Sequence, residues 1–161
     1  MTTHVIGIDP GLYGAVALLG PPAHPLVLDM PTMKAGTERY AVQTQVNPAA
    51  LADMLRRLTD GIRDETIVVM ERVDGYIDNK AACFSMGNSF GCVRGVVATL
   101  GLPLHIVRAQ DWKKHYSLKR DKELSRRRAI ELYPMAPLDK IKHHNRAEAI
   151  LIARYGWEEL R

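Results

Sequence analysis

The sequence has few of the features that mark secreted or membrane-embedded proteins. Its only two cysteines, Cys83 and Cys92, form neither a CxxC pair nor a disulfide framework, which favours a reducing, cytoplasmic setting. Its apolar runs are too short for a transmembrane span. The opening MTTHVIGIDPG has no basic stretch followed by an apolar one, so we expect no signal peptide. Internal repeats and low-complexity segments are also absent from the sequence.

The composition is that of a globular protein with an uneven distribution of charge. With 161 residues, 47% of them hydrophobic, we expect a single domain over residues 1–161. Residues 1–107 carry a net charge of −2, whereas residues 108–146 contain 12 basic and 5 acidic residues, a net charge of +7. Such a basic block is typical of a polyanion-binding face, although a solvated Lys- and Arg-rich helix has the same composition.

Short apolar runs alternate with amphipathic segments along the chain. The runs predict strands at 4–9, 14–19, 26–30, 66–70 and 102–107. The amphipathic segments predict helices at 47–58, 84–100, 121–132 and 147–155, and polar 34–45 is expected to be a mobile loop. Strands that alternate with helices predict an α/β fold, with a mixed five-stranded sheet flanked by helices.

Two of the predicted strands end in an acidic residue. Asp9 follows VIGI and precedes Pro-Gly, and Glu71 follows the β-branched run TIVVM. Each has an ordinary alternative, because Asp9 can form a turn and Glu71 can pair with Arg72. A carboxylate at the end of a buried strand must be compensated, however, and ligands of α/β sheets gather at this edge. We therefore interpret Asp9 and Glu71 as candidate site residues.

A third candidate acid lies in the segment HHNRAEAILIA, at the start of the last predicted helix. Glu148 shares a face with Leu151, Ile152 and Tyr155, so it is expected to face the core. The alternative is a Glu that only interacts favourably with the helix dipole. Three clustered carboxylates repel one another, and a divalent cation with oxygen ligands relieves that repulsion. Together with the basic block, this pattern predicts a metal-dependent nuclease.

These residues and their neighbours resemble the RuvC-type Holliday junction resolvases, in particular the shorter, phage-like branch. The resemblance follows the family's order through GIDPG with Gly14, VVMER, GNSFGCVRGVVATLGLP, IVRAQDWKK and NRAEAILIA. It implies a ribonuclease-H-like fold, a homodimer, two Mg²⁺ ions for which Mn²⁺ can substitute, and paired symmetric nicking of four-way DNA junctions in DNA recombination and repair. The implied setting is the cytoplasm of a bacterial or phage-infected cell.

The resemblance places the family's acids on Asp9, Glu71 and Glu148, with Glu in place of the more usual Asp at the last position. One turn earlier the family has another Asp, where this chain offers His144 and Asn145. His144 is our predicted fourth site residue and metal ligand, because imidazole binds Mn²⁺ well. The alternatives are that Asn145 fills this position or that both residues only cap the helix.

The resemblance also implies residues that contact DNA. Lys113 and Lys114 match the family's lysine after the fifth strand, Lys122 resembles a second phosphate-facing lysine, and Tyr76 is the aromatic in a loop that meets the junction centre. The arginines at 126–128 cannot all face one way on a helix. The full predicted DNA-binding set is Lys113, Lys114, Lys119, Lys122, Arg126 and Tyr76.

Gly87, Gly91 and Gly95 recur every four residues on the long predicted helix. We expect this smooth face to pack closely on the sheet, the alternative being close approach to a dimer partner or DNA. Rival functions are a ribonuclease H, a flap or fork nuclease, and a junction-binding protein without catalysis. A sugar-kinase-like ATPase would need a second glycine-rich phosphate loop, which the sequence lacks.

Overall fold

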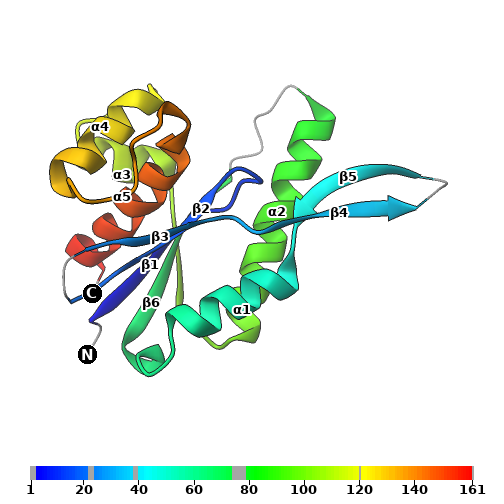
Figure 1. Ribbon diagram of the computed structural model, residues 1–161, viewed down its shortest axis with the longest axis horizontal. Helices are drawn as coiled ribbons and strands as arrows, with labels where there is room; N and C mark the ends of the chain where they lie inside the picture. Colours follow the sequence, from blue (N-terminus) through cyan, green and yellow to red (C-terminus); the bar gives the residue numbers. More distant parts are fainter. Residues whose placement is uncertain (1–2, 22–23, 38–39, 74–78, 120, 161) are drawn as a thin grey trace.

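The structure is a computed structural model that describes the chain except for residues 1–2, 22–23, 38–39, 74–78, 120 and 161 (Figure 1). The strands are β1 (His4–Asp9), β2 (Ala15–Leu19), β3 (Leu26–Asp29), β4 (Thr32–Thr37), β5 (Tyr40–Val46), β6 (Thr66–Glu71) and β7 (Leu104–Val107). The α-helices are α1 (Pro48–Leu58), α2 (Lys80–Thr99), α3 (Ala109–His115), α4 (Lys122–Leu132) and α5 (His144–Glu159). The short 3₁₀ turns η1 (Arg63–Glu65) and η2 (Ile141–His143) complete the set.

The main sheet has five strands in the order β3-β2-β1-β6-β7. β1 and β2 are antiparallel, as are β2 and β3, whereas β1 runs parallel to β6 and β6 runs parallel to β7. The predicted mixed five-stranded sheet is therefore confirmed, with each strand within two residues of its predicted bounds. In the described part of the chain, no helix is long and apolar enough to cross a membrane.

The prediction of a mobile loop at residues 34–45 is wrong, because β4 and β5 form an antiparallel hairpin there. The hairpin projects beyond the main sheet, at the right of Figure 1. Its strands lack a strong apolar alternation, and Lys34 Nζ donates to Thr44 Oγ1 across the pair at 2.6 Å. A polar two-stranded ribbon is held by its backbone ladder, so the hydrophobic pattern that revealed the other strands gave no signal here.

The four predicted helices are all present, but two of them begin earlier than predicted. α1 starts as expected, with Asn47 Oδ1 accepting from the Ala50 amide at 3.1 Å and Pro48 in the first turn. α2 begins at Lys80, four residues before the predicted start, because Asn79 caps it. α5 begins at His144, three residues early, and α3 was not predicted.

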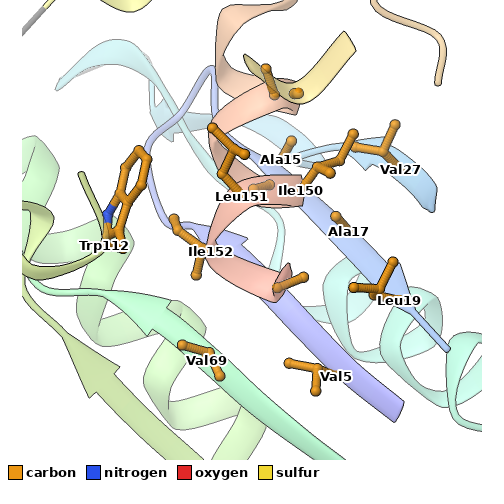
Figure 2. Packing of buried hydrophobic residues seen from close by; sticks show 14 of the residues in the cluster. Val5, Ala15, Ala17, Leu19, Val27, Val69, Trp112, Ile150, Leu151 and Ile152 are labelled. Carbon is orange, nitrogen blue, oxygen red and sulfur yellow. The ribbon is translucent and has the colours of Figure 1, made fainter. Parts of the chain in front are cut away.

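Helices cover both faces of the main sheet (Figure 1). α1 and α2 lie on the face that presents Ile6, Ile8 and Val68. The opposite face, with Val5 and Val69, packs against α3, α4 and α5, and Figure 2 shows α5 side chains standing over it. Residues of odd number in β1 and β6, which include Asp9 and Glu71, therefore point toward α5.

Gly7 lets α5 approach β1 closely. A Cβ added to Gly7 would collide with the backbone of Ala149 and lie 2.8 Å from the Cα of Ala153. On the other side of the sheet, the prediction that Gly87, Gly91 and Gly95 pack closely is wrong. A Cβ added at any of them meets no atom within 4 Å, because α2 turns Val93 and its buried neighbours, not its glycines, toward the core.

Candidate active site

Asp9 is the last residue of β1 and is held by the turn that follows it. The Gly11 amide donates to Asp9 Oδ1 at 3.3 Å, and the Gly14 amide donates to the Gly11 carbonyl at 2.9 Å. A side chain at Gly14 would collide with the Asp9 carbonyl and lie 2.8 Å from the Gly11 carbonyl oxygen. The glycines in GIDPGLYG thus permit a compact loop that returns directly into β2 and leaves the carboxylate at the edge of the sheet.

Glu71 is brought beside Asp9 by strand register. Ile8 pairs with Met70 in the parallel β1–β6 ladder, so Asp9 and Glu71 follow at the next position of neighbouring strands. Trp112, fully buried on α3, donates its Nε1–H to Glu71 Oε2 at 2.8 Å. This bond fixes one of the two carboxylate oxygens of Glu71.

Glu148 comes from α5, above the same edge of the sheet. Its side chain is buried, with 6% relative exposure, as the helical spacing predicted. Lys113 Nζ lies 3.2 Å from Glu148 Oε1, and Ser125 Oγ donates to the same oxygen at 3.4 Å. The Lys113 ammonium also lies 4.9 Å from the ring centroid of Trp112, so α3 supplies a cation and an indole to the two glutamates.

The three carboxylates are electrostatically coupled. Burial and, to a smaller extent, the negative charge of Glu148 raise the pKa of Asp9 to about 6, against the Gly11 hydrogen bond and the charges of Lys122 and Lys113. Burial also raises the pKa of Glu71 to about 7, opposed by the Trp112 hydrogen bond and reinforced by the charge of Asp9. Two raised pKa values at one edge of the sheet indicate that the positive charges of the protein do not fully compensate the ionised carboxylates.

The donor set suits a hard divalent cation, since it consists of carboxylate oxygens that repel one another. In the arrangement seen here, however, no three His, Cys, Asp or Glu side chains of the described residues are grouped closely enough to hold one metal ion. The ion pair between Lys113 and Glu148 engages one of the carboxylate oxygens that a metal would need. The residues thus fit the chemistry of a metal, with Lys113 as the competing cation.

The two candidates for the fourth position face different neighbours. His144 Nδ1 lies 3.3 Å from the Ile141 carbonyl oxygen. Asn145 donates from Nδ2 to the Tyr13 carbonyl at 2.6 Å and accepts from Lys122 Nζ at 3.2 Å. Neither is the helix cap, which is His143 without a side-chain capping bond. Asn145 therefore ties the loop after β1 to α4, whereas the ligand role of His144 stays a prediction.

Two of the predicted DNA-binding lysines, Lys113 and Lys122, act on the carboxylates through their charge. Lys113, Lys114 and Lys119 line an open hollow of about 1040 Å³ beside α3. Lys122, in the first turn of α4, lowers the pKa of Asp9 through its charge. The basic block of the sequence is thus partly gathered at the site edge.

Arg126 and Tyr76 are placed differently. Arg126 donates to both carboxylate oxygens of Glu123, at 2.9 and 2.8 Å, and to the Leu138 carbonyl at 2.7 Å. Its guanidinium therefore has intramolecular partners, and Arg127, with 71% of its side chain exposed, is the freer arginine on α4. Tyr76 lies outside the described residues.

Sequence reasoning missed three contributors: Trp112, Ser125 and the Tyr13 carbonyl. The motif DWKK contained the signal for Trp112, since a Trp beside a site lysine has a ring N–H that needs a partner when buried. Ser125 and Tyr13 offered no such signal, because their roles depend on how α4 and the loop after β1 meet α5.

The order β3-β2-β1-β6-β7, with three antiparallel strands followed by parallel ones and helices on both faces, is the ribonuclease-H-like fold, as predicted. Two solved structures share it over nearly their whole length. T. thermophilus RuvC in complex with Holliday junction substrate matches with a TM-score of 0.59 at 14% sequence identity, covering 97% of this chain and 96% of that chain. A second Thermus thermophilus RuvC structure gives 0.55 at 18% identity, covering 93% and 90%. No protein-family model and no curated protein matches the sequence.

Proposed function

We propose that this protein is a metal-dependent, structure-selective endodeoxyribonuclease that resolves four-way DNA junctions by paired, symmetric nicks. One observation carries the proposal: Asp9, Glu71 and Glu148, from three distant segments, meet as coupled carboxylates beside Lys113 and Lys122. Clustered carboxylates beside lysines suit the binding of a divalent cation that contacts both the protein and a phosphate. The likeness of the fold to a RuvC bound to Holliday junction substrate supports branched DNA as the substrate.

Asp9, Glu71 and Glu148 would hold Mg²⁺, two ions per site by the family resemblance, with Mn²⁺ able to substitute and His144 as the predicted fourth ligand. Bound divalent ions supply an activated water and offset charge on the leaving oxygen. The chain's own residues prepare the site. Trp112 orients Glu71, and Lys113 holds a positive charge against Glu148, where it would offset the charge of a phosphate held at the carboxylates.

Paired nicks require two active sites, so the proposal includes a homodimer. The exposed face of α2 supports this, because its three glycines leave the helix backbone open to close approach. Phe84, which shares this face of the helix with the glycines, is also exposed, at 72%. An apolar, smooth helix face of this kind suits contact with a second copy.

The test compares the wild type with Asp9→Asn on a synthetic four-way junction, in Mg²⁺ and in Mn²⁺. Loss of nicking with binding retained supports the proposal, because the substitution removes one carboxylate charge and keeps the size of the side chain. Full activity of Asp9→Asn would rule it out. Replication forks, flaps and RNA–DNA hybrids as parallel substrates decide between a junction resolvase and the related nucleases.

A second candidate is a junction-binding protein without catalysis. The Lys113–Glu148 ion pair and the spacing of the carboxylates favour it, since both describe a site balanced by an internal cation. This candidate predicts tight, salt-dependent junction binding and no cutting in either metal. Nicking by the wild type in Mg²⁺ or Mn²⁺ would eliminate it.

A further inference from the structure

A second hollow lies where α5 begins and shares Lys122 with the candidate active site. It has a volume of about 820 Å³ and lies between the loop after β1, the start of β4 and the η2–α5 junction. We call it the η2 hollow and define it by six of its lining residues: Tyr13, Lys122, Lys140, Lys142, Asn145 and Arg146.

The η2 hollow has an excess of positive charge. Lys140 and Lys142 are exposed and form no ion pair with any described residue. Arg146 is already neutralised, since its guanidinium donates to both carboxylate oxygens of Asp29 at 2.6 and 2.7 Å. Asp139 is the remaining acid on the wall, and it lies 3.3 Å from His143. Lys140 and Lys142 therefore keep their charge unpaired among the described residues, whereas Lys122 donates to Asn145.

The hollow is linked to the candidate active site by Lys122 and Asn145. Lys122 lowers the pKa of Asp9 by its charge and at the same time lines the hollow. Asn145 accepts from Lys122 and donates to the Tyr13 carbonyl, so it connects the wall of the hollow to the loop that follows Asp9. The other hollow, which Lys113 and Lys119 line, is formed by different elements, namely α3 and the segment that follows it. A DNA strand whose scissile phosphate lies at the carboxylates continues as sugar-phosphate backbone on both sides of that phosphate.

We propose that the η2 hollow binds the phosphodiester backbone of the substrate strand on one side of the scissile phosphate, with Lys140 and Lys142 as its phosphate contacts. The inference rests on the proposed function and adds Lys140 and Lys142, which lie in the basic block of residues 108–146, to the predicted DNA-binding residues. Exposed, unpaired lysines in an open hollow suit an extended polyanion, because each lysine neutralises one phosphate and releases counterions. A small anion would need buried, converging donors instead.

The experiment measures binding of a fluorescent four-way junction without divalent metal, from about 50 to 200 mM salt. Lys140→Ala/Lys142→Ala is compared with Arg56→Ala/Arg57→Ala, which removes the same charge from α1 on the other face of the sheet. We expect the lysine pair to weaken binding roughly tenfold or more, and to lower the salt slope by about 0.9 for each lost phosphate contact. The arginine pair should bind as the wild type does.

A third variant, Lys140→Arg/Lys142→Arg, keeps the charge and should restore both the affinity and the salt slope. An unchanged slope in the alanine pair, an equal loss in the arginine pair of α1, or failure of the Lys→Arg pair to rescue would each overturn the inference. Failure of the proposed function is seen separately. In that case the wild type itself shows no preference for the junction over duplex DNA and no nicking in Mg²⁺ or Mn²⁺.

Discussion

Helices α5 and α2 are both rich in small residues, yet they lie on opposite faces of the sheet and use those residues differently. On α5, Ala149 and Ala153 approach Gly7 so closely that no side chain fits between them. On α2, Gly91 and the two glycines a turn away from it face open space. The first arrangement sets the height of Glu148 above Asp9, and the second leaves a surface uncovered. Small residues thus position the candidate site residue Glu148 on one face of the sheet and expose helix backbone on the other.

The strongest test of this comparison is Gly7→Ala. The added Cβ would overlap the backbone of Ala149 and Ala153, and backbone cannot rotate away as a flexible side chain can. We expect a loss of about 3 kcal/mol or more in the free energy of unfolding, measured by urea denaturation. Junction cleavage should fall as well, since α5 carries Glu148. Gly91→Ala is the matched control, and a Gly7→Ala protein as stable as that control would contradict the close-packing argument.

Trp112→Phe tests the hydrogen bond to Glu71, on the face of the sheet that α5 covers. The substitution shrinks a fully buried ring and leaves Glu71 Oε2 without its donor, so we expect a loss of about 2 kcal/mol. The hydrogen bond holds the pKa of Glu71 down, so its loss should raise that pKa further. The pH at which the cleavage rate rises should then move upward. Trp157→Phe, at the partly buried edge of the same core, should leave the pH profile unchanged.

The raised pKa values predict how the metal-free protein responds to pH. Folding raises the pKa of Asp9 from 3.8 to about 6 and that of Glu71 from 4.5 to about 7. Between about pH 4 and 7 the folded state therefore binds more protons than the unfolded state, and the free energy of unfolding falls as pH rises through this window. In EDTA, Asp9→Asn should stabilise the protein by on the order of 2 kcal/mol at about pH 8, and by little at about pH 4.

Thermal unfolding at the two pH values measures this effect. Adding Mg²⁺ at the higher pH should stabilise the wild type more than Asp9→Asn, because only the wild type retains the full carboxylate set. If the stabilities of the wild type and Asp9→Asn differ by the same amount at both pH values, the ionised Asp9 carboxylate does not destabilise the folded state. The α2 side contains no such pair of coupled acids among the described residues, so Gly91→Ala should respond equally at both.

The sequence revealed what depends on local pattern. Apolar runs that end in an acid predicted β1 and β6 with their carboxylates, and helical spacing predicted that Glu148 faces inward. It could not reveal what depends on contacts between distant segments. The hydrogen bond from Trp112 to Glu71 joins residues 41 positions apart in the sequence. The small residues of α5 are packed and those of α2 are exposed, which depends on the face that each helix turns toward the sheet. The β4–β5 hairpin escaped notice because the sequences of its two strands lack a strong apolar alternation.

His144 and Asn145 offer a finer test, because they lie side by side at the start of α5. Asn145→Ala removes the link between the Tyr13 carbonyl and Lys122, so we expect cleavage to fall roughly tenfold in both metals. His144→Ala tests the predicted ligand, whose loss should lower cleavage at least tenfold in Mg²⁺ or Mn²⁺. Rates measured side by side decide the roles. An unchanged rate for His144→Ala would limit that residue to its contact with the Ile141 carbonyl.

The smallest expected effect concerns α2. In a monomer, Gly91→Ala should stabilise the protein by up to about 1 kcal/mol, because alanine favours a helix and the added methyl group meets no atom. In a dimer that packs on this face, the same methyl group would hold the two helices apart and weaken association. Denaturation at low protein concentration and sedimentation at high concentration separate the two contributions. Stabilisation together with unchanged association would place the dimer contact elsewhere, and the glycines of α2 would then cost stability without serving an interface on that face.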